Sequence, residues 1–385
     1  MNIPYNKAFH TGKEQEFIQD AIRKNHISGD GYYTKLINKF IQEKFNINRA
    51  LMTTSCTHAL DMAAMLIDLK PGDEVILPSY TFVSTVNAIV LRGAIPVFID
   101  IVPSTLNIDS NKIEDKITKR TKAIFPVHYA GVGCEMDLIM DIAQKHDLYV
   151  VEDAAQGVNA KYNGQYLGSI GHIGSYSFHE TKNYSCGEGG AITINSLNQE
   201  LIERAEIIRE KGTNRSKFFR GQVDKYTWVD IGSSYLPSDI LAAFLWAQFQ
   251  ELDNINELRR TIYNRYYETL LPYEERGILR LPVIPPNCES NFHMFYILLP
   301  DENRRNEVIY KLKVKGINSV FHYIPLHSSP MGQQFGYKVG DLPITEDLSS
   351  RLLRLPMYAG MTMDEQEYVL ENLQSILMEV KHAAS

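Results

Sequence analysis

The sequence contains few cysteines and no closely spaced cysteine pair. The four cysteines of the 385-residue chain stand at positions 56, 134, 186 and 288. That spacing excludes a zinc ribbon and argues against a disulfide framework, so we expect reduced thiols, no metal site and a cytoplasmic protein. Residues 1–7 contain no apolar signal segment, and the most apolar stretch, 88–102, is interrupted by Arg92 and Asp100. We therefore expect neither a secretory signal nor a membrane span.

The sequence also lacks an excess of positive charge. It has 39 Lys and Arg against 46 Asp and Glu, a formal net charge of −7, and no basic run. We therefore expect neither a nucleic acid nor a membrane as a partner. A hydrophobic fraction of 44% and a charged fraction of 22% are typical of a globular protein, and the length is enough for two domains.

Helical and strand-like segments alternate along the first half of the chain. Short apolar β-rich runs are separated by stretches of helical periodicity, with the runs at 74–77, 95–99, 122–127, 148–151, 174–178 and 191–194. This alternation predicts an α/β fold with a mostly parallel sheet covered on both faces. One long helix from Ser238 toward Leu271 is predicted to lead into a smaller α+β region, with a strand at 317–322 among its elements. We divide the chain into a large domain with an N-terminal arm, residues 1–245, and a small C-terminal domain, residues 246–385.

Candidate site residues stand where strands of such a sheet end, the edge at which open α/β sheets bind ligands. Residues Thr53 to Thr57 precede a helix whose N-terminus could bind phosphate, although a plain helix cap explains them as well. Asp153 could hold a proton on a heteroaromatic nitrogen or cap the following turn. Lys182 lies beside Gly-rich backbone, where a partly desolvated amine can form a Schiff base, whereas most lysines are solvated. Phe82 could stack on a planar cofactor or belong to the core.

Taken together, these groups match the requirements of pyridoxal 5'-phosphate (PLP). This cofactor needs an amine for its aldehyde, a carboxylate on its ring nitrogen, a phosphate cup and a stacking face. Lys182, once the substrate displaces it from the cofactor, is the natural base for the proton shift. We therefore expect PLP as the cofactor, with Lys182 and Asp153 as catalytic residues.

The motifs of the chain resemble those of the DegT/DnrJ/EryC1/StrS family, which are sugar-nucleotide aminotransferases of PLP fold type I. The resemblance runs from about Gly29 to the C-terminal region and is densest over 71–190. It is carried by PGDEVI at 71–76, SYTF at 79–82, PVHYAG at 126–131, EDAAQ at 152–156, SFH at 177–179 with Lys182, and FHYIPLH at 321–327. It implies a fold-type I PLP-dependent aminotransferase with a large domain and a smaller C-terminal domain.

The resemblance also implies a role for individual residues. Lys182 would bond to the cofactor, and Asp153 would contact its ring nitrogen. Gln156 would lie at the hydroxyl side of the ring and Phe82 on its face. The implied phosphate-binding residues are Cys56 (through its backbone), Thr57 and Ser177. The implied sugar-facing residues are His179, which we also count as catalytic, Tyr323 and His327, although each histidine could equally have a structural role.

Within the family, the runs 209–216 and 222–228 resemble those of the branch that aminates dTDP-4-keto-6-deoxy-D-glucose at C4 for enterobacterial common antigen. The basic residues of the first run could contact the diphosphate or end a solvated helix. The similarity implies transfer of an amino group from L-glutamate, giving dTDP-4-amino-4,6-dideoxy-D-galactose. Amination at C3, a gluco-configured product and a UDP-linked sugar remain alternatives. Family members that are sugar dehydratases place a histidine where Lys182 stands, so the lysine argues against that chemistry.

The resemblance further implies a homodimer with shared active sites. Many relatives send an Asn from the partner subunit to the phosphate, but segment 232–237 of this chain has none, so a serine could replace it. A nicotinamide-dependent oxidoreductase would need G-x-G-x-x-G, and Gly131-Val132-Gly133 lacks the third glycine. A non-catalytic binding protein on the same scaffold would differ by the absence of a coloured cofactor.

Overall fold

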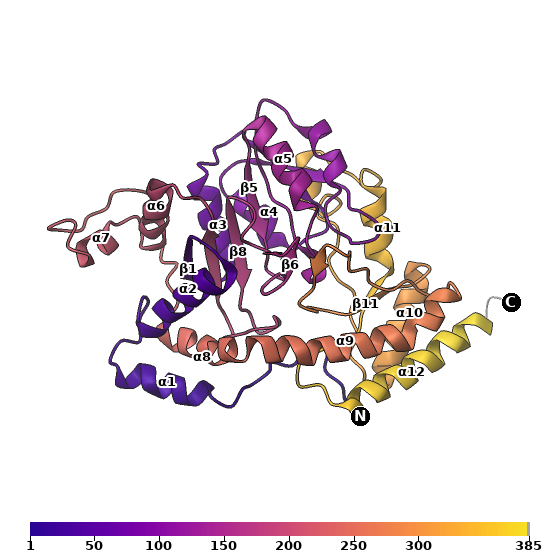
Figure 1. The fold of residues 1–385 in the computed structure, drawn as a ribbon. Helices are drawn as coiled ribbons and strands as arrows, with labels where there is room; N and C mark the ends of the chain where they lie inside the picture. The colour runs from indigo at the N-terminus through magenta and orange to yellow at the C-terminus, as the bar shows by residue number, and fades with distance from the viewer. Residues whose placement is uncertain (383–385) are drawn as a thin grey trace.

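The centre of the molecule is a seven-stranded sheet in the order β1-β9-β8-β5-β4-β2-β3 (Figure 1). The structure is a computed structural model and describes residues 1–382. Neighbouring strands from β3 to β8 run parallel, whereas β9 is antiparallel to both β1 and β8. This confirms the predicted mostly parallel sheet and adds one strand that the sequence pattern did not show, β1. The strands are β1 (Arg49–Thr53), β2 (Glu74–Pro78), β3 (Ile95–Ile99), β4 (Thr121–Ile124), β5 (Tyr149–Asp153), β8 (Ile173–Ser177) and β9 (Gly190–Ile194).

Helices cover both faces of this sheet because successive side chains of each strand point to opposite sides. In β2, Ile76 packs into a buried cluster on one face, while Val75 and Leu77 pack into a second cluster on the other. The helices of the first cluster are α2 (Tyr32–Phe45), α5 (Met136–His146) and α8 (Asp239–Gln250). Those of the second are α3 (Cys56–Leu66), α4 (Val83–Val90) and α6 (Gln199–Arg209). Burial on both faces explains why the strands are apolar throughout instead of alternating with polar residues.

The predicted long helix is two helices placed end to end along one side of the molecule (Figure 1). Helix α8 begins after Ser238, whose side chain accepts a hydrogen bond from the Leu241 amide, as expected for an N-cap. The helical path breaks at Glu251, and α9 runs over Leu252–Glu275. The prediction of one continuous helix was therefore wrong at this residue. The domain division after residue 245 falls within α8 and stays a prediction.

The C-terminal part of the chain builds a smaller α+β unit with its own core. It contains the antiparallel pair β11 (Tyr296–Leu298) and β12 (Leu352–Arg354), with helices α10 (Glu302–Val314), α11 (Pro343–Arg351) and α12 (Met363–His382). The predicted strand at 317–322 was wrong, because this segment makes only isolated bridges, Ile317 with Ile3 and Val320 with Arg354. The core residues of this C-terminal unit include Tyr266, Phe295, Leu312 and Leu353.

Shorter elements complete the chain. At the N-terminus α1 (Glu14–Arg23) packs on α8. Near the larger sheet, β6 (Lys161–Tyr162), β7 (Gln165–Tyr166) and β10 (Cys288–Glu289) form a three-stranded sheet. Helix α7 (Arg215–Phe219) lies on an arm that projects from the body of the molecule beyond α6 (Figure 1). Over residues 1–382, no helix combines the length and apolar character needed to cross a membrane.

Candidate active site

A cavity of about 630 Å³ lies at the carboxyl ends of the parallel strands, between the sheet and the C-terminal part of the chain. All of the predicted site residues except His327 line it. They are Cys56, Thr57, Phe82, Asp153, Gln156, Ser177, His179, Lys182 and Tyr323. The topology of the sheet explains this convergence, because the loops that follow parallel strands meet at one edge.

Lys182 follows β8 in a short turn, which is held by a hydrogen bond from the Lys182 amide to the His179 carbonyl. Burial lowers the pKa of its amine below the ordinary value, although the nearby carboxylate of Asp153 opposes this shift. A lowered pKa increases the fraction of uncharged amine, which is the form that attacks a carbonyl carbon. The structure therefore gives Lys182 the environment that the sequence predicted for it.

Asp153 ends β5 and is almost fully buried. Its Oδ2 accepts a hydrogen bond of 2.7 Å from the Thr85 hydroxyl, and its Oδ1 accepts one of 3.1 Å from the Ala155 amide. The Thr85 hydroxyl is itself 2.9 Å from that of Thr81. Because Thr85 donates to the carboxylate, Thr81 must donate to Thr85. This chain of donors fixes the orientation of the carboxylate and leaves one lone pair on each oxygen for a ligand.

The turn between β1 and α3 has the form of an anion site. Ser55 caps α3 by accepting a hydrogen bond from the His58 amide, so the amides of Cys56 and Thr57 begin the helix without intrahelical partners. Gly190 passes so close that a Cβ there would lie 2.4 Å from the Cys56 nitrogen. The Thr57 hydroxyl contacts Ser84 at 2.7 Å, which ties this turn to α4.

Phe82, Gln156 and Tyr323 lie together on the lining of the cavity. The Phe82 side chain is 55% exposed although phenylalanine is strongly apolar, because it borders the cavity. Gln156 accepts a hydrogen bond from the Ala130 amide and donates one of 3.0 Å to the Tyr323 hydroxyl. The Tyr323 ring stacks on His322 with 3.6 Å between ring centres. These contacts hold the amide of Gln156 and the phenol of Tyr323 in defined positions.

The two histidines that were predicted to face the sugar differ in position. His179 borders the cavity, where its Nδ1 accepts a hydrogen bond from the Thr181 amide and its Nε2 lies 3.6 Å from Glu188. His327 is fully buried outside the cavity, with Nδ1 2.7 Å from the Ser79 hydroxyl and Nε2 2.8 Å from Glu346. Both of its nitrogens are engaged in joining β2 to α11, so the structure does not bring His327 to the substrate as expected.

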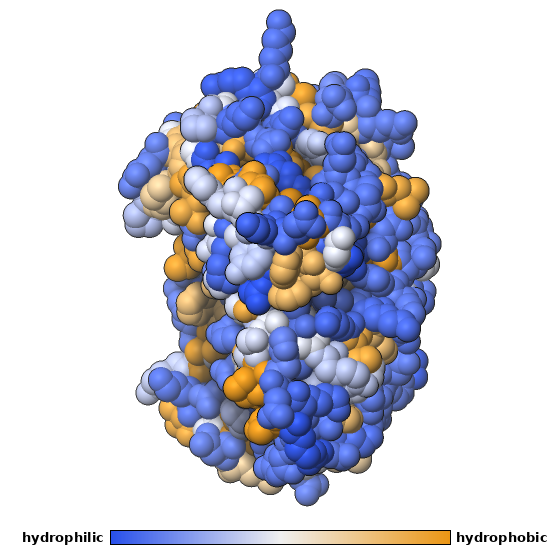
Figure 2. Space-filling model, turned by 90° about the vertical axis from the view of Figure 1, so that its left-hand side faces the viewer, coloured by the Kyte–Doolittle hydropathy of each residue, from blue (hydrophilic) through white to orange (hydrophobic). Residues whose placement is uncertain are grey.

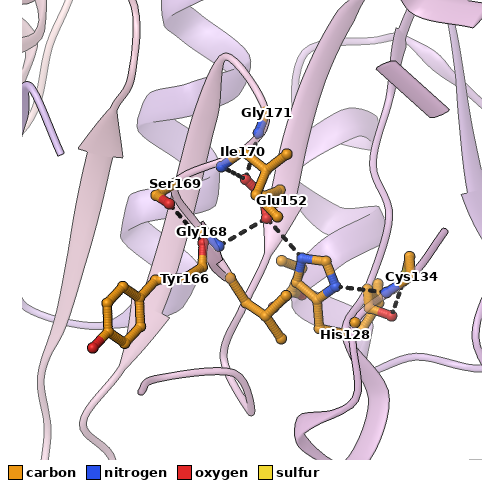
Figure 3. Close-up of polar contacts among 12 residues, drawn as sticks. His128, Cys134, Glu152, Tyr166, Gly168, Ser169, Ile170 and Gly171 are labelled. Carbon is orange, nitrogen blue, oxygen red and sulfur yellow. Dashed lines mark hydrogen bonds and ion pairs between the residues drawn. The ribbon is translucent and has the colours of Figure 1, made fainter. Parts of the chain in front are cut away.

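A buried carboxylate next to Asp153 fixes the strand that carries it (Figure 3). Glu152 points to the opposite side of β5 and accepts hydrogen bonds from three backbone amides and one imidazole. The donors are Gly168 (2.8 Å), Ile170 (2.7 Å), Gly171 (2.6 Å) and His128 Nε2 (2.8 Å). The Nδ1 of His128 accepts from the Cys134 amide, which assigns the proton to Nε2. This network fixes β5 relative to its neighbouring loops and gives Glu152 a structural role.

Some site residues gave no signal in the sequence analysis. Thr85 could have been found, because it lies in the first turn of α4, the helix that directly follows the SYTF motif. His293 and Arg354 come from the C-terminal part of the chain and border the cavity through tertiary folding alone. Burial lowers the pKa of His293 well below its ordinary value, and the positive charges of Lys182, Arg259 and Arg354 lower it further, so its ring is neutral.

A larger cavity, about 900 Å³, lies between α2, α6 and α7 and contains none of the predicted site residues. Arg209, the first basic residue of the run 209–216, is buried there and donates to both oxygens of Asp30 at 2.6 and 2.7 Å. Arg215 stacks over Phe219 at 5.1 Å. The run therefore starts with a structural ion pair, and Arg209 is not free to contact a diphosphate.

The residues around the first cavity fit PLP. An amine, a carboxylate, an anion-binding helix N-terminus and an exposed aromatic face lie around one space of sufficient volume. When bound, PLP supplies an electron sink that stabilises negative charge at the amine-bearing carbon. Asp153 would hold the proton on the ring nitrogen, and α3 would bind the phosphate. The displaced amine of Lys182 would take a proton from one carbon and return it to another.

The fold and this site define a PLP-dependent aminotransferase of fold type I. The chain belongs to the DegT/DnrJ/EryC1/StrS aminotransferase family, whose pattern matches residues 10–374. SpsC of Bacillus subtilis, a spore coat polysaccharide biosynthesis protein, is 33% identical over 97% of this chain and 97% of its own. GDP-perosamine synthase of Caulobacter vibrioides is 32% identical over 95% and 96%. The PLP form of Spr1654 from Streptococcus pneumoniae superimposes with a TM-score of 0.91 at 25% identity, covering 99% of this chain and 100% of that chain.

Proposed function

We propose that the protein transfers the amino group of L-glutamate to C4 of dTDP-4-keto-6-deoxy-D-glucose, giving dTDP-4-amino-4,6-dideoxy-D-galactose. The observation that carries the aminotransferase part is the convergence of Lys182 and Asp153 on one cavity, with Phe82 and Tyr323 on its wall. The runs 209–216 and 222–228 support the choice of sugar by their resemblance to the branch with that substrate.

The acceptor class is supported by the relatives, whose names refer to a nucleotide-linked amino sugar and to polysaccharide biosynthesis. A related keto sugar nucleotide is the second candidate. The similarity to GDP-perosamine synthase favours a GDP-linked sugar among these alternatives, beside the UDP-linked, C3-aminated and gluco-configured possibilities.

Product analysis tests the proposal directly. The purified enzyme is incubated with L-glutamate and, in parallel, with dTDP-, GDP- and UDP-linked 4-keto sugars and a dTDP-linked 3-keto sugar. The expected result is an amine at C4 of the dTDP sugar, axial by NMR coupling constants. A product formed faster from another nucleotide, at C3, or with an equatorial amine contradicts the proposed substrate or product while leaving the aminotransferase assignment in place.

The role of Lys182 has its own test. The wild-type protein is expected to be yellow when PLP is bound, and the colour is expected to vanish after reduction with borohydride. Lys182→Ala should lack the covalent link, seen by mass spectrometry of the reduced protein, while retaining its fold by circular dichroism. A reduced wild-type protein with PLP on another lysine would contradict the assignment.

We also propose that the enzyme is a homodimer with shared active sites. The arm around α7 exposes a group of large apolar side chains: Phe219 (69%), Tyr226 (52%), Trp228 (76%) and Val229 (50%). Figure 2, which views the side of the molecule that bears this arm, shows apolar patches on a largely polar surface. Exposed apolar groups of this kind mark protein contact sites. A second copy of the chain would cover them, and the exposed Ser233 and Ser234 beside the arm could then reach the partner's phosphate site.

Light scattering coupled to gel filtration tests the dimer. The wild-type protein is expected at twice the chain mass, and Trp228→Ser together with Phe219→Ser is expected to shift it toward the monomer and to lower activity. A stable, fully active monomer would overturn the proposal. We further propose a cytoplasmic location, supported by the free state of all four cysteines.

A further inference from the structure

The cavity contains one guanidinium that has no anionic partner. Arg354 ends β12 and lines the same cavity as the anion site at α3. Over the part of the chain that the structure describes, no carboxylate forms an ion pair with it. Its Nη2 donates to the Phe321 carbonyl at 3.2 Å, and its Nε is buried without an acceptor. An incompletely paired, partly buried positive charge is costly unless a ligand provides the counter-charge.

The backbone and the ring beneath it hold Arg354 in place. Its amide donates to the Val320 carbonyl at 2.8 Å, and its carbonyl accepts from the Val320 amide at 3.2 Å. On the other side it pairs with Tyr296 of β11. Its guanidinium carbon lies 4.6 Å from the centre of the Tyr5 ring. Tyr5 therefore supports one face of the planar group, and Arg354 still lines the cavity, where a ligand can meet it.

The charge of Arg354 acts on the reacting end of the cavity. Burial chiefly lowers the pKa values of Lys182, His293 and His322, and the charge of Arg354 contributes to lowering all three. Arg354 and Lys182 line the same cavity, so an anion bound at Arg354 would share that cavity with the Lys182 amine. Asp153 and the N-terminus of α3 are already assigned to the ring nitrogen and the phosphate of the cofactor, which leaves Arg354 for a group carried by a substrate.

We propose that Arg354 binds the α-carboxylate of the amino-acid donor. This inference rests on the proposed function, in which L-glutamate supplies the amine. The donor's amine must reach the cofactor carbon to which Lys182 would be bonded. The donor's α-carboxylate is attached to the same donor carbon as that amine. The carboxylate therefore falls within a few bonds of the Lys182 position. The two-donor edge of a guanidinium matches a carboxylate in geometry and charge.

The competing ligand for the same group is the diphosphate of the sugar nucleotide. The two ligands enter in different half-reactions, so they can be separated. The donor half-reaction converts PLP-enzyme to its amine form with L-glutamate, and the acceptor half-reaction consumes that form with the keto sugar. A carboxylate anchor affects only the first, and a diphosphate anchor affects only the second.

The test uses the PLP-loaded enzyme with Arg354→Gln and Arg354→Lys. Binding of 2-oxoglutarate to the PLP form, which cannot react, is measured by calorimetry, and single-turnover rates are measured for each half-reaction. We expect Arg354→Gln to weaken 2-oxoglutarate binding and to lower kcat/KM for L-glutamate by about 10²-fold. Arg354→Lys should give values between those of the wild type and Arg354→Gln. The acceptor half-reaction should change less than about threefold.

Arg351→Gln is the matched control. Arg351 stands three residues before Arg354, is paired with Asp347, and does not line the cavity. It should leave both half-reactions unchanged. A small primary amine without a carboxylate should react equally with the wild type and Arg354→Gln, which excludes general damage to the site.

Three outcomes would overturn the inference: L-glutamate kinetics unchanged in Arg354→Gln, a loss confined to the acceptor half-reaction, or no binding of glutamate or 2-oxoglutarate to the wild type. Failure of the proposed acceptor sugar is distinguishable from these, because the donor half-reaction and the calorimetry do not require it.

Discussion

The hydroxyl of Thr85 donates a 2.7 Å hydrogen bond to Oδ2 of Asp153, and both groups are buried. The bond joins the first turns of α4 to the end of β5, two elements far apart in the sequence. A carboxylate that is aimed at a ring nitrogen must not rotate, and this contact prevents rotation. It would also support the proposed contact of Asp153 with the cofactor, and it can be removed without substituting Asp153.

Thr85→Val tests this support, because valine keeps the shape of threonine and removes the hydroxyl. A hydrogen bond to a charged group contributes about 1.5–3 kcal/mol, so we expect kcat to fall by roughly tenfold or more. PLP should bind more weakly, as measured by titration of the cofactor-free protein. Thr85→Ser should restore both values, and equal kcat for Thr85→Val and the wild type would refute the role.

Asp153→Asn should separate cofactor binding from turnover. The amide can occupy the same space, so PLP is expected to remain bound, as seen by absorbance. It cannot hold a proton on the ring nitrogen, so kcat should fall by about 10²–10³-fold, the range seen when a preorganised electrostatic group is removed. A variant with near-normal turnover would show that the ring nitrogen needs no carboxylate.

Gly190→Ala should damage the phosphate site. The added Cβ would lie 2.3 Å from the Ser55 carbonyl carbon and 2.4 Å from the Cys56 nitrogen, both of which are backbone atoms. The turn must move, and we expect PLP affinity to fall by about tenfold, with about 1–3 kcal/mol lost from the free energy of unfolding. Gly360→Ala is the control, because its nearest neighbour is a Phe9 ring carbon at 3.7 Å. Equal PLP affinity in the two variants would argue against the site.

Glu152→Gln should lower stability strongly. Gln keeps one acceptor oxygen but turns its NH₂ toward donors that Glu152 now accepts from. We expect about 3 kcal/mol to be lost from the free energy of unfolding, as for a broken buried pair. Glu289→Gln, which breaks an exposed ion pair with Lys161, should cost less than about 1 kcal/mol. Urea unfolding of both variants checks the difference, and similar values would contradict the structural role of Glu152.

The neutral state of His293 predicts an acid-sensitive fold. Because its folded-state pKa is lower than the ordinary 6.5, the unfolded chain binds a proton between the two values that the folded chain does not. The free energy of unfolding should therefore decrease as pH falls below about 6.5, with a slope of up to about 1.4 kcal/mol per pH unit from this group. Urea unfolding of the wild type and of His293→Gln between pH 8 and 5 measures this slope. A slope equal in the two proteins would exclude the contribution of His293.

Much of the large domain could be predicted from the sequence. Strands β2, β3 and β5 lie where apolar β-rich runs indicated them. The features that the sequence analysis did not predict correctly were missed for physical reasons. β1 stands before a helix N-terminus whose polar residues masked it, and the segment 317–322 lacks a neighbouring strand to pair with beyond isolated bridges. The break at Glu251 leaves the helical periodicity of the sequence intact, so no pattern shows it.

The residues of the candidate site could likewise be predicted only in part. Residues that follow strands, such as Lys182 and Asp153, could be predicted because the strand order of a parallel sheet brings its loops to one edge. His327 has the right motif but both of its nitrogens are engaged with Ser79 and Glu346, which only packing reveals.

The sequence by itself determined most of the sheet and the family, and predicted the cofactor-binding groups, because these depend on periodicity and on residue types at fixed distances along the chain. Only the tertiary structure decided that Arg354 and Lys182 line one cavity and that Thr85 donates a hydrogen bond to Asp153. These pairs are separated by 172 and 68 residues, and side chains that far apart meet only when the chain has packed.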